Sequence, residues 1–83
     1  MSTADTIRSI LAQHGKLAVD AGALGDDDNL YSAGLTSHAT VNVMLALEDA
    51  FDVEFPDKYL KRATFGSVAS LQAALDSLLD GGQ

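Results

Sequence analysis

The fold of this chain is decided by Ser37–Phe51, which reads SHATVNVMLALEDAF. The residues directly before it, Tyr31–Thr36, read YSAGLT, and their small side chains and glycine suit a turn. The first turn of a helix has unpaired amide groups that favour a nearby side-chain oxygen, and Ser37 falls at that position. We therefore expect Ser37 to open a helix that runs through this stretch.

Two apolar seams follow this helix at steps of three and four residues. One seam contains Val41, Met44, Leu45 and Glu48, and the other contains Val43, Leu47, Ala50 and Phe51. Packing into one core uses only one such stripe. The surplus apolar surface beside a serine predicts that the serine end and part of the helix face something outside this chain.

The flanking segments predict further helices and no strand. Apolar residues at helical spacing indicate a first helix over about Thr3–His14 and a last helix from Phe65 to about Leu79, capped by Thr64. After Pro56, residues 58–62 allow a turn or two of helix. We therefore expect an all-α fold: a small antiparallel bundle of three main helices and one short helix, with residues 1–83 as a single domain.

A long first loop over residues 16–29 separates the first two main helices. Loops of this length in so small a domain are uncommon unless they are functional or anchored. Its apolar side chains are expected to anchor it to the core: Leu17, Val19 and Leu24.

Composition restricts the class of partner. The chain has 83 residues, no cysteine, five Lys and Arg against twelve Asp and Glu, and a formal charge of −7. This charge disfavours nucleic acids and anionic membranes and favours basic protein surfaces. The sequence has neither an apolar run of membrane-spanning length nor the apolar centre of a signal peptide, so we expect a soluble, cytoplasmic protein.

Catalytic and metal sites are weakly signalled. Consecutive helical residues point about 100° apart, so His38 cannot readily act as a base for Ser37, which disfavours a hydrolase. Asp26–Asp28 only begin the pattern of a calcium loop, and a solvated loop is the better interpretation. For Ser37 alone, the simplest role is that of a helix cap, worth about 1 kcal/mol.

The wider spacing of residues indicates more than a cap. The pattern comprises Asn29-Leu30-Tyr31, then Gly34-Leu35-Thr36-Ser37, Val41, Leu47-Glu48-Asp49, Phe51, Phe55-Pro56-Asp57 and Thr64. This pattern resembles the acyl and peptidyl carrier protein family from about Asp28 to Leu79, and Thr3–His14 fits the first helix of that family. The resemblance implies the family's four-helix fold and a non-catalytic carrier.

The resemblance also implies a cofactor and partners. Ser37 matches the serine that receives 4′-phosphopantetheine, a flexible arm whose thiol holds cargo as a thioester. The implied partners are a phosphopantetheinyl transferase, an enzyme that loads the cargo and a downstream acceptor enzyme, and we expect the carrier to be a monomer. The residues expected to bind partners are Thr36, His38, Val41, Met44, Leu45, Glu48 and Asp49.

Two positions depart from the common family pattern. Thr36 stands where the family most often has Asp or His, and His38 stands where it has Leu. Thr36 cannot supply a carboxylate at the transferase interface, so the transferase must recognise this site differently. Ala39 and Asn42 also make the helix start less acidic than in fatty-acid carriers.

The run from Gly34 to Val41 is most similar to free-standing bacterial carriers that synthetase-like ligases load with amino acids. We therefore expect a small amino acid as cargo. The apolar stripes are needed for packing and leave little room for an internal cavity, so a small polar cargo would stay in water. The alternatives are a fatty-acyl, polyketide or peptide-synthetase carrier and, in another class, an unmodified acidic helical adaptor.

Overall fold

The computed structural model describes residues 3–15 and 17–80 of the chain. Within these ranges the regular structure is helical, with α1 at Thr3–His14, α2 at Ser37–Phe51 and α3 at Val68–Leu79. Two single-turn 3₁₀ helices, η1 at Ala21–Ala23 and η2 at Asp57–Tyr59, lie in the connecting segments. None of the described helices is long and apolar enough to cross a membrane.

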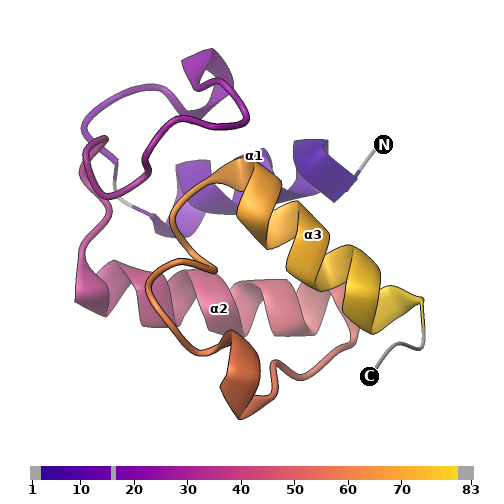
Figure 1. The fold of residues 1–83 in the computed structure, drawn as a ribbon. Coiled ribbons are helices and arrows are strands. Elements are labelled where there is room, and N and C mark those ends of the chain that lie inside the picture. The colour runs from indigo at the N-terminus through magenta and orange to yellow at the C-terminus, as the bar shows by residue number, and fades with distance from the viewer. Residues whose placement is uncertain (1–2, 16, 81–83) are drawn as a thin grey trace.

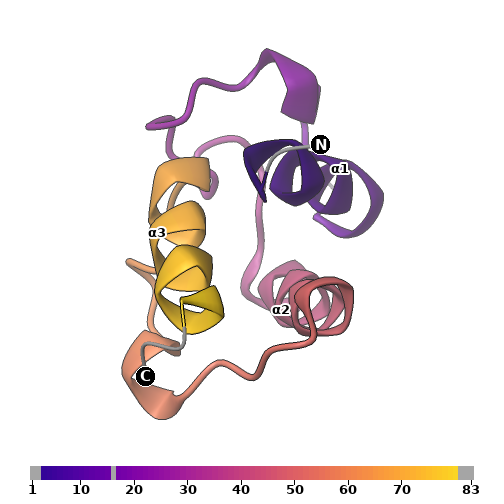
Figure 2. The same cartoon turned by 90° about the vertical axis from the view of Figure 1, so that its right-hand side faces the viewer.

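The three α-helices form a triangle in which α1 packs against both α2 and α3 (Figures 1 and 2). The α1 and α2 helices run in opposite directions, and the long first loop lies across the end of the bundle. The backbones of α2 and α3 approach each other little. Residues 52–67 connect these two helices and cover the space beside them.

One apolar core holds this arrangement together. Each helix buries a stripe at helical spacing, and side chains from the loops fill the remaining space. Phe55 and Phe65 pack together in the core with ring centroids 5.7 Å apart. Each large side chain that is fully buried contributes about 1.5–3 kcal/mol through removal from water. These are Ile7, Leu11, Leu30, Val43, Leu47, Val68, Leu71 and Leu75.

The long loop is anchored, as predicted, although not by all the expected residues. Leu17 and Leu24 pack against the core, whereas Val19 is half exposed, so its predicted anchoring role is wrong. Arg8 of α1 replaces it by donating to the Leu24 carbonyl oxygen at 2.9 Å and pairing with the Asp26 carboxylate. A polar side chain on α1 therefore fixes a loop that apolar patterning alone did not explain.

Gly34 fixes the turn that precedes α2. Its φ of +117° lies in a region that side chains rarely adopt, and a Cβ there would lie 2.7 Å from the Ala18 nitrogen. The same Ala18 nitrogen donates to the Ala33 carbonyl oxygen at 2.8 Å. The absence of a side chain at residue 34 therefore lets the first loop pack directly against the turn that leads into α2.

The predicted all-α bundle and the bounds of its first two main helices are confirmed, whereas the predicted start and cap of the last helix are wrong. The expected short helix is present as the single 3₁₀ turn η2, which begins one residue earlier than expected and ends at Tyr59. The last helix begins at Val68, not Phe65, because Ser67 and Ser70 form a reciprocal capping box. Thr64 is buried before the helix, and its carbonyl oxygen accepts a hydrogen bond from Ser70 Oγ at 2.9 Å.

Candidate functional site

At the start of α2, one residue caps the helix and a different residue presents a free hydroxyl group. Thr36 is the N-cap residue, and its Oγ1 accepts a hydrogen bond from the Ala39 backbone nitrogen at 3.0 Å. The Thr36 carbonyl oxygen also accepts a hydrogen bond from Thr40 Oγ1 at 2.7 Å. Ser37 is therefore the first residue of the helix, as expected, and the role of cap, which was the simplest one for Ser37 alone, belongs to Thr36.

This one-residue shift leaves the Ser37 side chain available. Ser37 is exposed, and within residues 3–15 and 17–80 its hydroxyl group has no hydrogen-bond partner. The first turn of α2 contains no acidic residue, so the positive end of the helix dipole is not neutralised locally. An anion attached to Ser37 Oγ would lie close to unpaired backbone amide groups.

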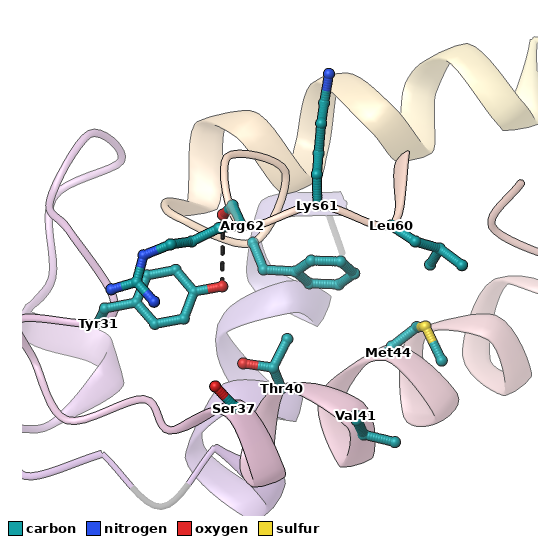
Figure 3. Close-up of a pocket in the computed structure, with 9 residues that line it drawn as sticks. Tyr31, Ser37, Thr40, Val41, Met44, Leu60, Lys61 and Arg62 are labelled. Carbon is teal, nitrogen blue, oxygen red and sulfur yellow. Dashed lines mark hydrogen bonds between the residues drawn. The ribbon is translucent and has the colours of Figure 1, made fainter. Parts of the chain in front are cut away.

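A surface groove of about 410 Å³ begins at Ser37 (Figure 3). One wall is the outer face of α2, and the opposite wall comes from the segment that follows η2, together with Tyr31. The lining residues are Tyr31, Ser37, Thr40, Val41, Met44, Leu60, Lys61, Arg62 and Phe65. The groove therefore joins the exposed serine to apolar side chains that the core does not use.

Arg62 and Tyr31 form the end of this groove nearest the start of α2. The Arg62 guanidinium carbon lies 3.8 Å from the centre of the Tyr31 ring, a cation–π contact. The Tyr31 hydroxyl donates a long hydrogen bond of 3.4 Å to the Arg62 carbonyl oxygen. These contacts join segments 31 residues apart in the sequence and form the wall opposite Ser37.

Most of the predicted partner-binding residues share the outer side of α2. At about 100° per residue, Ser37, Val41 and Met44 form one strip, while His38, Leu45 and Asp49 form the adjacent strip. Val41 and Leu45 are 50% and 54% exposed, although both are large apolar residues. The buried face of the same helix, formed by Ala39, Val43 and Leu47, lies on the opposite side. The predicted surplus of apolar surface on α2 is therefore present.

Glu48 differs from the other predicted partner residues. It is half-buried, and its Oε2 accepts a hydrogen bond from the Phe55 backbone nitrogen at 2.8 Å. This bond ties the end of α2 to the chain that leads into η2. Glu48 therefore has a structural role that its sequence position did not reveal, whereas Asp49 beside it is exposed.

Sequence reasoning missed the far wall of the groove. In the sequence, Tyr31 belongs to the motif with Asn29 and Leu30, and residues 58–62 indicate only a possible short helix. In the structure, Arg62 lies over an aromatic ring instead. Lys61 and Arg62 are separated only by Ala63 from the buried Thr64 and Phe65, but nothing in the sequence links them to Tyr31.

Metal chemistry is not favoured by the part of the chain that the structure describes. No group of three or more His, Asp or Glu side chains is close enough there to hold a metal ion. In the acidic run, Asp26 pairs with Arg8, and an Asp28 carboxylate oxygen accepts from the Gly25 nitrogen at 2.8 Å. Two of its carboxylates thus stabilise the loop itself.

An exposed serine hydroxyl without a partner among the described residues, at a helix start and beside an apolar outer face, suits a helical protein that carries a group on a serine side chain. The model of the phosphopantetheine attachment site family matches residues 5–75, so the chain belongs to that family. This finding confirms the predicted family and its covalent cofactor, 4′-phosphopantetheine. The geometry of Ser37 fits that group.

Relatives of known function are similar over nearly the whole chain. A protein from Agrobacterium fabrum (strain C58 / ATCC 33970), described as an aminoacyl carrier protein, is 45% identical over 76 residues, covering 92% of each chain. The chain also matches one chain in a crystal structure of a complex. That complex contains an engineered Bradyrhizobium japonicum glycine:[carrier protein] ligase, a carrier protein from Agrobacterium tumefaciens and ATP. That match has a TM-score of 0.87 and 41% identity over 90% of this chain and 97% of the other.

A second structure shows a related complex. It contains Bradyrhizobium japonicum glycine:[carrier protein] ligase and a glycylated carrier protein, and the match has a TM-score of 0.75. Identity there is 28%, over 87% of this chain and 96% of the other. The similarity therefore extends to carriers seen with their loading enzymes.

Proposed function

We propose that this chain is an aminoacyl carrier protein whose 4′-phosphopantetheine arm is attached to Ser37. The observation that carries the proposal is the division of roles at the start of α2. Thr36 Oγ1 caps the helix through the Ala39 nitrogen, which leaves the Ser37 hydroxyl exposed and unpaired among the described residues. Modification of Ser37 would therefore not remove the cap. When bound, the arm supplies a thiol that holds the cargo as a thioester.

The chain's own residues supply the attachment point and its surroundings. Ser37 Oγ loses its proton and bonds to the phosphorus of coenzyme A that bears the pantetheine arm, while the diphosphate P–O bond breaks and adenosine 3′,5′-bisphosphate leaves. The amide groups of the first turn of α2 stabilise the negative charge of the phosphodiester. The chain contributes no catalytic group to loading. It acts as the substrate of a phosphopantetheinyl transferase, a loading ligase and a downstream acceptor enzyme. We expect these reactions in the cytoplasm, with residues 1–83 acting as one monomeric carrier domain.

The proposed cargo is a small amino acid, activated by an ATP-dependent ligase. The similar carriers include one in complex with a glycine:[carrier protein] ligase and one that is glycylated. The described interior is filled by packed side chains, and the groove beside Ser37 is open at the surface. A small polar cargo would therefore remain in contact with water at the end of its arm.

The outer face of α2 is the proposed docking surface for these enzymes. Val41 and Leu45 supply exposed apolar contacts, and Asp49 supplies charge for a basic partner. His38 and Thr36 lie next to the attachment point, where a transferase must approach. Met44 lines the groove between this face and the segment that follows η2, so an enzyme bound to α2 would also contact the groove.

A loading assay tests the cargo. Holo protein, with the arm attached, is incubated with ATP and a glycine:[carrier protein] ligase, and separately with an acyl-loading enzyme and long-chain acyl substrates. Intact mass should show one small amino acid added in the first reaction and little product in the second. Efficient loading of long acyl chains without amino acid loading would reverse the cargo assignment. A chain that accepts no arm at all would favour the unmodified adaptor.

A further inference from the structure

Arg62 is an uncompensated cation in an acidic protein. The chain carries a formal charge of −7, yet the groove beside Ser37 is lined by Lys61 and Arg62 and by no acidic side chain. Within the described ranges, the Arg62 guanidinium has no carboxylate partner. The groove is therefore a local positive region on a negative molecule.

The contact with Tyr31 leaves the donors of Arg62 available. The guanidinium carbon lies over the ring at 3.8 Å from its centre, a distance that suits stacking of the flat guanidinium on the ring. Its N–H donors lie in the plane of the guanidinium and point outward from its edge. Tyr31 thus acts as a platform that limits the motion of Arg62 without consuming its hydrogen-bonding capacity.

Ser37 and Arg62 line the same groove. Figure 3 shows the Ser37 hydroxyl on the first turn of α2, at the end of the groove where Tyr31 and Arg62 form the opposite wall. Lys61 also lines the groove, but its amino group extends away from α2. The two adjacent cations therefore differ in direction, and only Arg62 lies across from the attachment point.

We propose that Arg62, supported by the Tyr31 ring, pairs with the phosphodiester that Ser37 carries once the arm is attached. This inference rests on the proposed function. A phosphodiester is an anion, and a guanidinium binds two of its oxygens at once. Because the phosphodiester is tethered within the groove, it competes effectively with free anions for the Arg62 guanidinium. The pair directs the first atoms of the arm along the groove, over Val41 and Met44, and Arg62 is a positioning residue.

The test compares apo and holo protein by NMR, with Arg62→Gln and the matched control Lys61→Gln. In the unchanged protein and in Lys61→Gln, attachment of the arm should shift the backbone amide resonances of Tyr31 and residues 61–65. In Arg62→Gln, these shifts should fall to the level seen for α3 residues remote from the groove. The ³¹P resonance should also differ between Arg62→Gln and the other two proteins.

Salt provides a second readout that does not depend on any variant. Raising NaCl to about 1 M shortens the screening length to about 3 Å, so the attachment-induced shifts at residues 61–65 should shrink in the unchanged holo protein. They should not respond to salt in Arg62→Gln. Equal shifts in Arg62→Gln and the unchanged protein, or shifts that do not respond to salt, would overturn the pairing. If Arg62→Gln does not fold, the salt response of the unchanged protein decides.

Intact mass distinguishes failure of the role of Arg62 from failure of the proposed function. An arm that attaches to Ser37 but leaves residues 61–65 undisturbed overturns only the role of Arg62. Failure of the unchanged protein to accept the arm overturns the proposed function and this inference with it.

Discussion

At the scale of single residues, the site depends on which of two adjacent hydroxyl groups caps α2. Threonine and serine both cap helices well, so the sequence predicts a cap at the right place but cannot distinguish Thr36 from Ser37. The backbone decides, because Thr36 is extended, with φ −97° and ψ 165°, while Ser37 is helical. The motif predicts Ser37 as the attachment residue, whereas it does not reveal which residue caps the helix.

This division of roles predicts that two alanine substitutions change the free energy of unfolding by different amounts. Thr36→Ala should lower the free energy of unfolding by about 0.5–2 kcal/mol, because the Ala39 nitrogen loses its acceptor. Ser37→Ala should change it by less than about 0.5 kcal/mol, as expected for an exposed residue without a hydrogen bond. Urea unfolding of both variants measures the difference. A larger loss for Ser37→Ala than for Thr36→Ala would show that the cap is misassigned.

At the scale of elements, the two faces of α2 were predictable and the start of α3 was not. Apolar spacing predicted two seams, and the structure buries Val43 and Leu47 of one seam while it exposes Val41 and Leu45 of the other. For α3, the apolar spacing extends to Phe65. However, Phe65 lies in a turn from which its side chain enters the core, and the helix begins only after Ser67. The sequence analysis chose Thr64 as the cap, whereas the cap is Ser67, three residues later, which forms a capping box with Ser70.

The two-sided helix predicts a contrast between Leu47→Ala and Leu45→Ala. Leu47 is 0% exposed, so its truncation should cost about 2–5 kcal/mol of stability through lost burial and a cavity. Leu45 is 54% exposed, so its truncation should cost far less stability but weaken binding of the loading ligase. Chemical unfolding and a ligase binding titration measure the two quantities. Undiminished ligase affinity in Leu45→Ala would remove the outer face of α2 from the docking surface.

At the scale of the whole molecule, composition and length predicted the class but not the groove. The negative charge and the apolar periodicity are properties of the linear sequence, and they indicated an acidic helical protein with basic partners. The groove arises because the turn before α2 and the chain after η2 meet in space, as the contact between Tyr31 and Arg62 shows. No local pattern encodes that meeting, so the far wall of the site could not be predicted.

The overall charge predicts salt-dependent docking, which a charge reversal tests. Asp49→Lys should slow association with the loading ligase and flatten its dependence on salt, because Asp49 is exposed on the docking face. Asp76→Lys makes the same charge change at an exposed position on α3 and serves as the control. Glu48 is left unchanged, because loss of its hydrogen bond to the Phe55 nitrogen would change stability as well as binding. Equal association rates for the two variants at low salt would mean that only net charge matters.

The most direct test of the central claim is the intact mass of the protein after incubation with coenzyme A, Mg²⁺ and a broad-specificity phosphopantetheinyl transferase. The unchanged protein should gain one phosphopantetheine group, Thr36→Ala should still gain one if it remains folded, and Ser37→Ala should gain none. Addition of the group to Ser37→Ala to the same extent as to the unchanged protein, or no addition to the unchanged protein, would contradict the assignment of Ser37 as the attachment site.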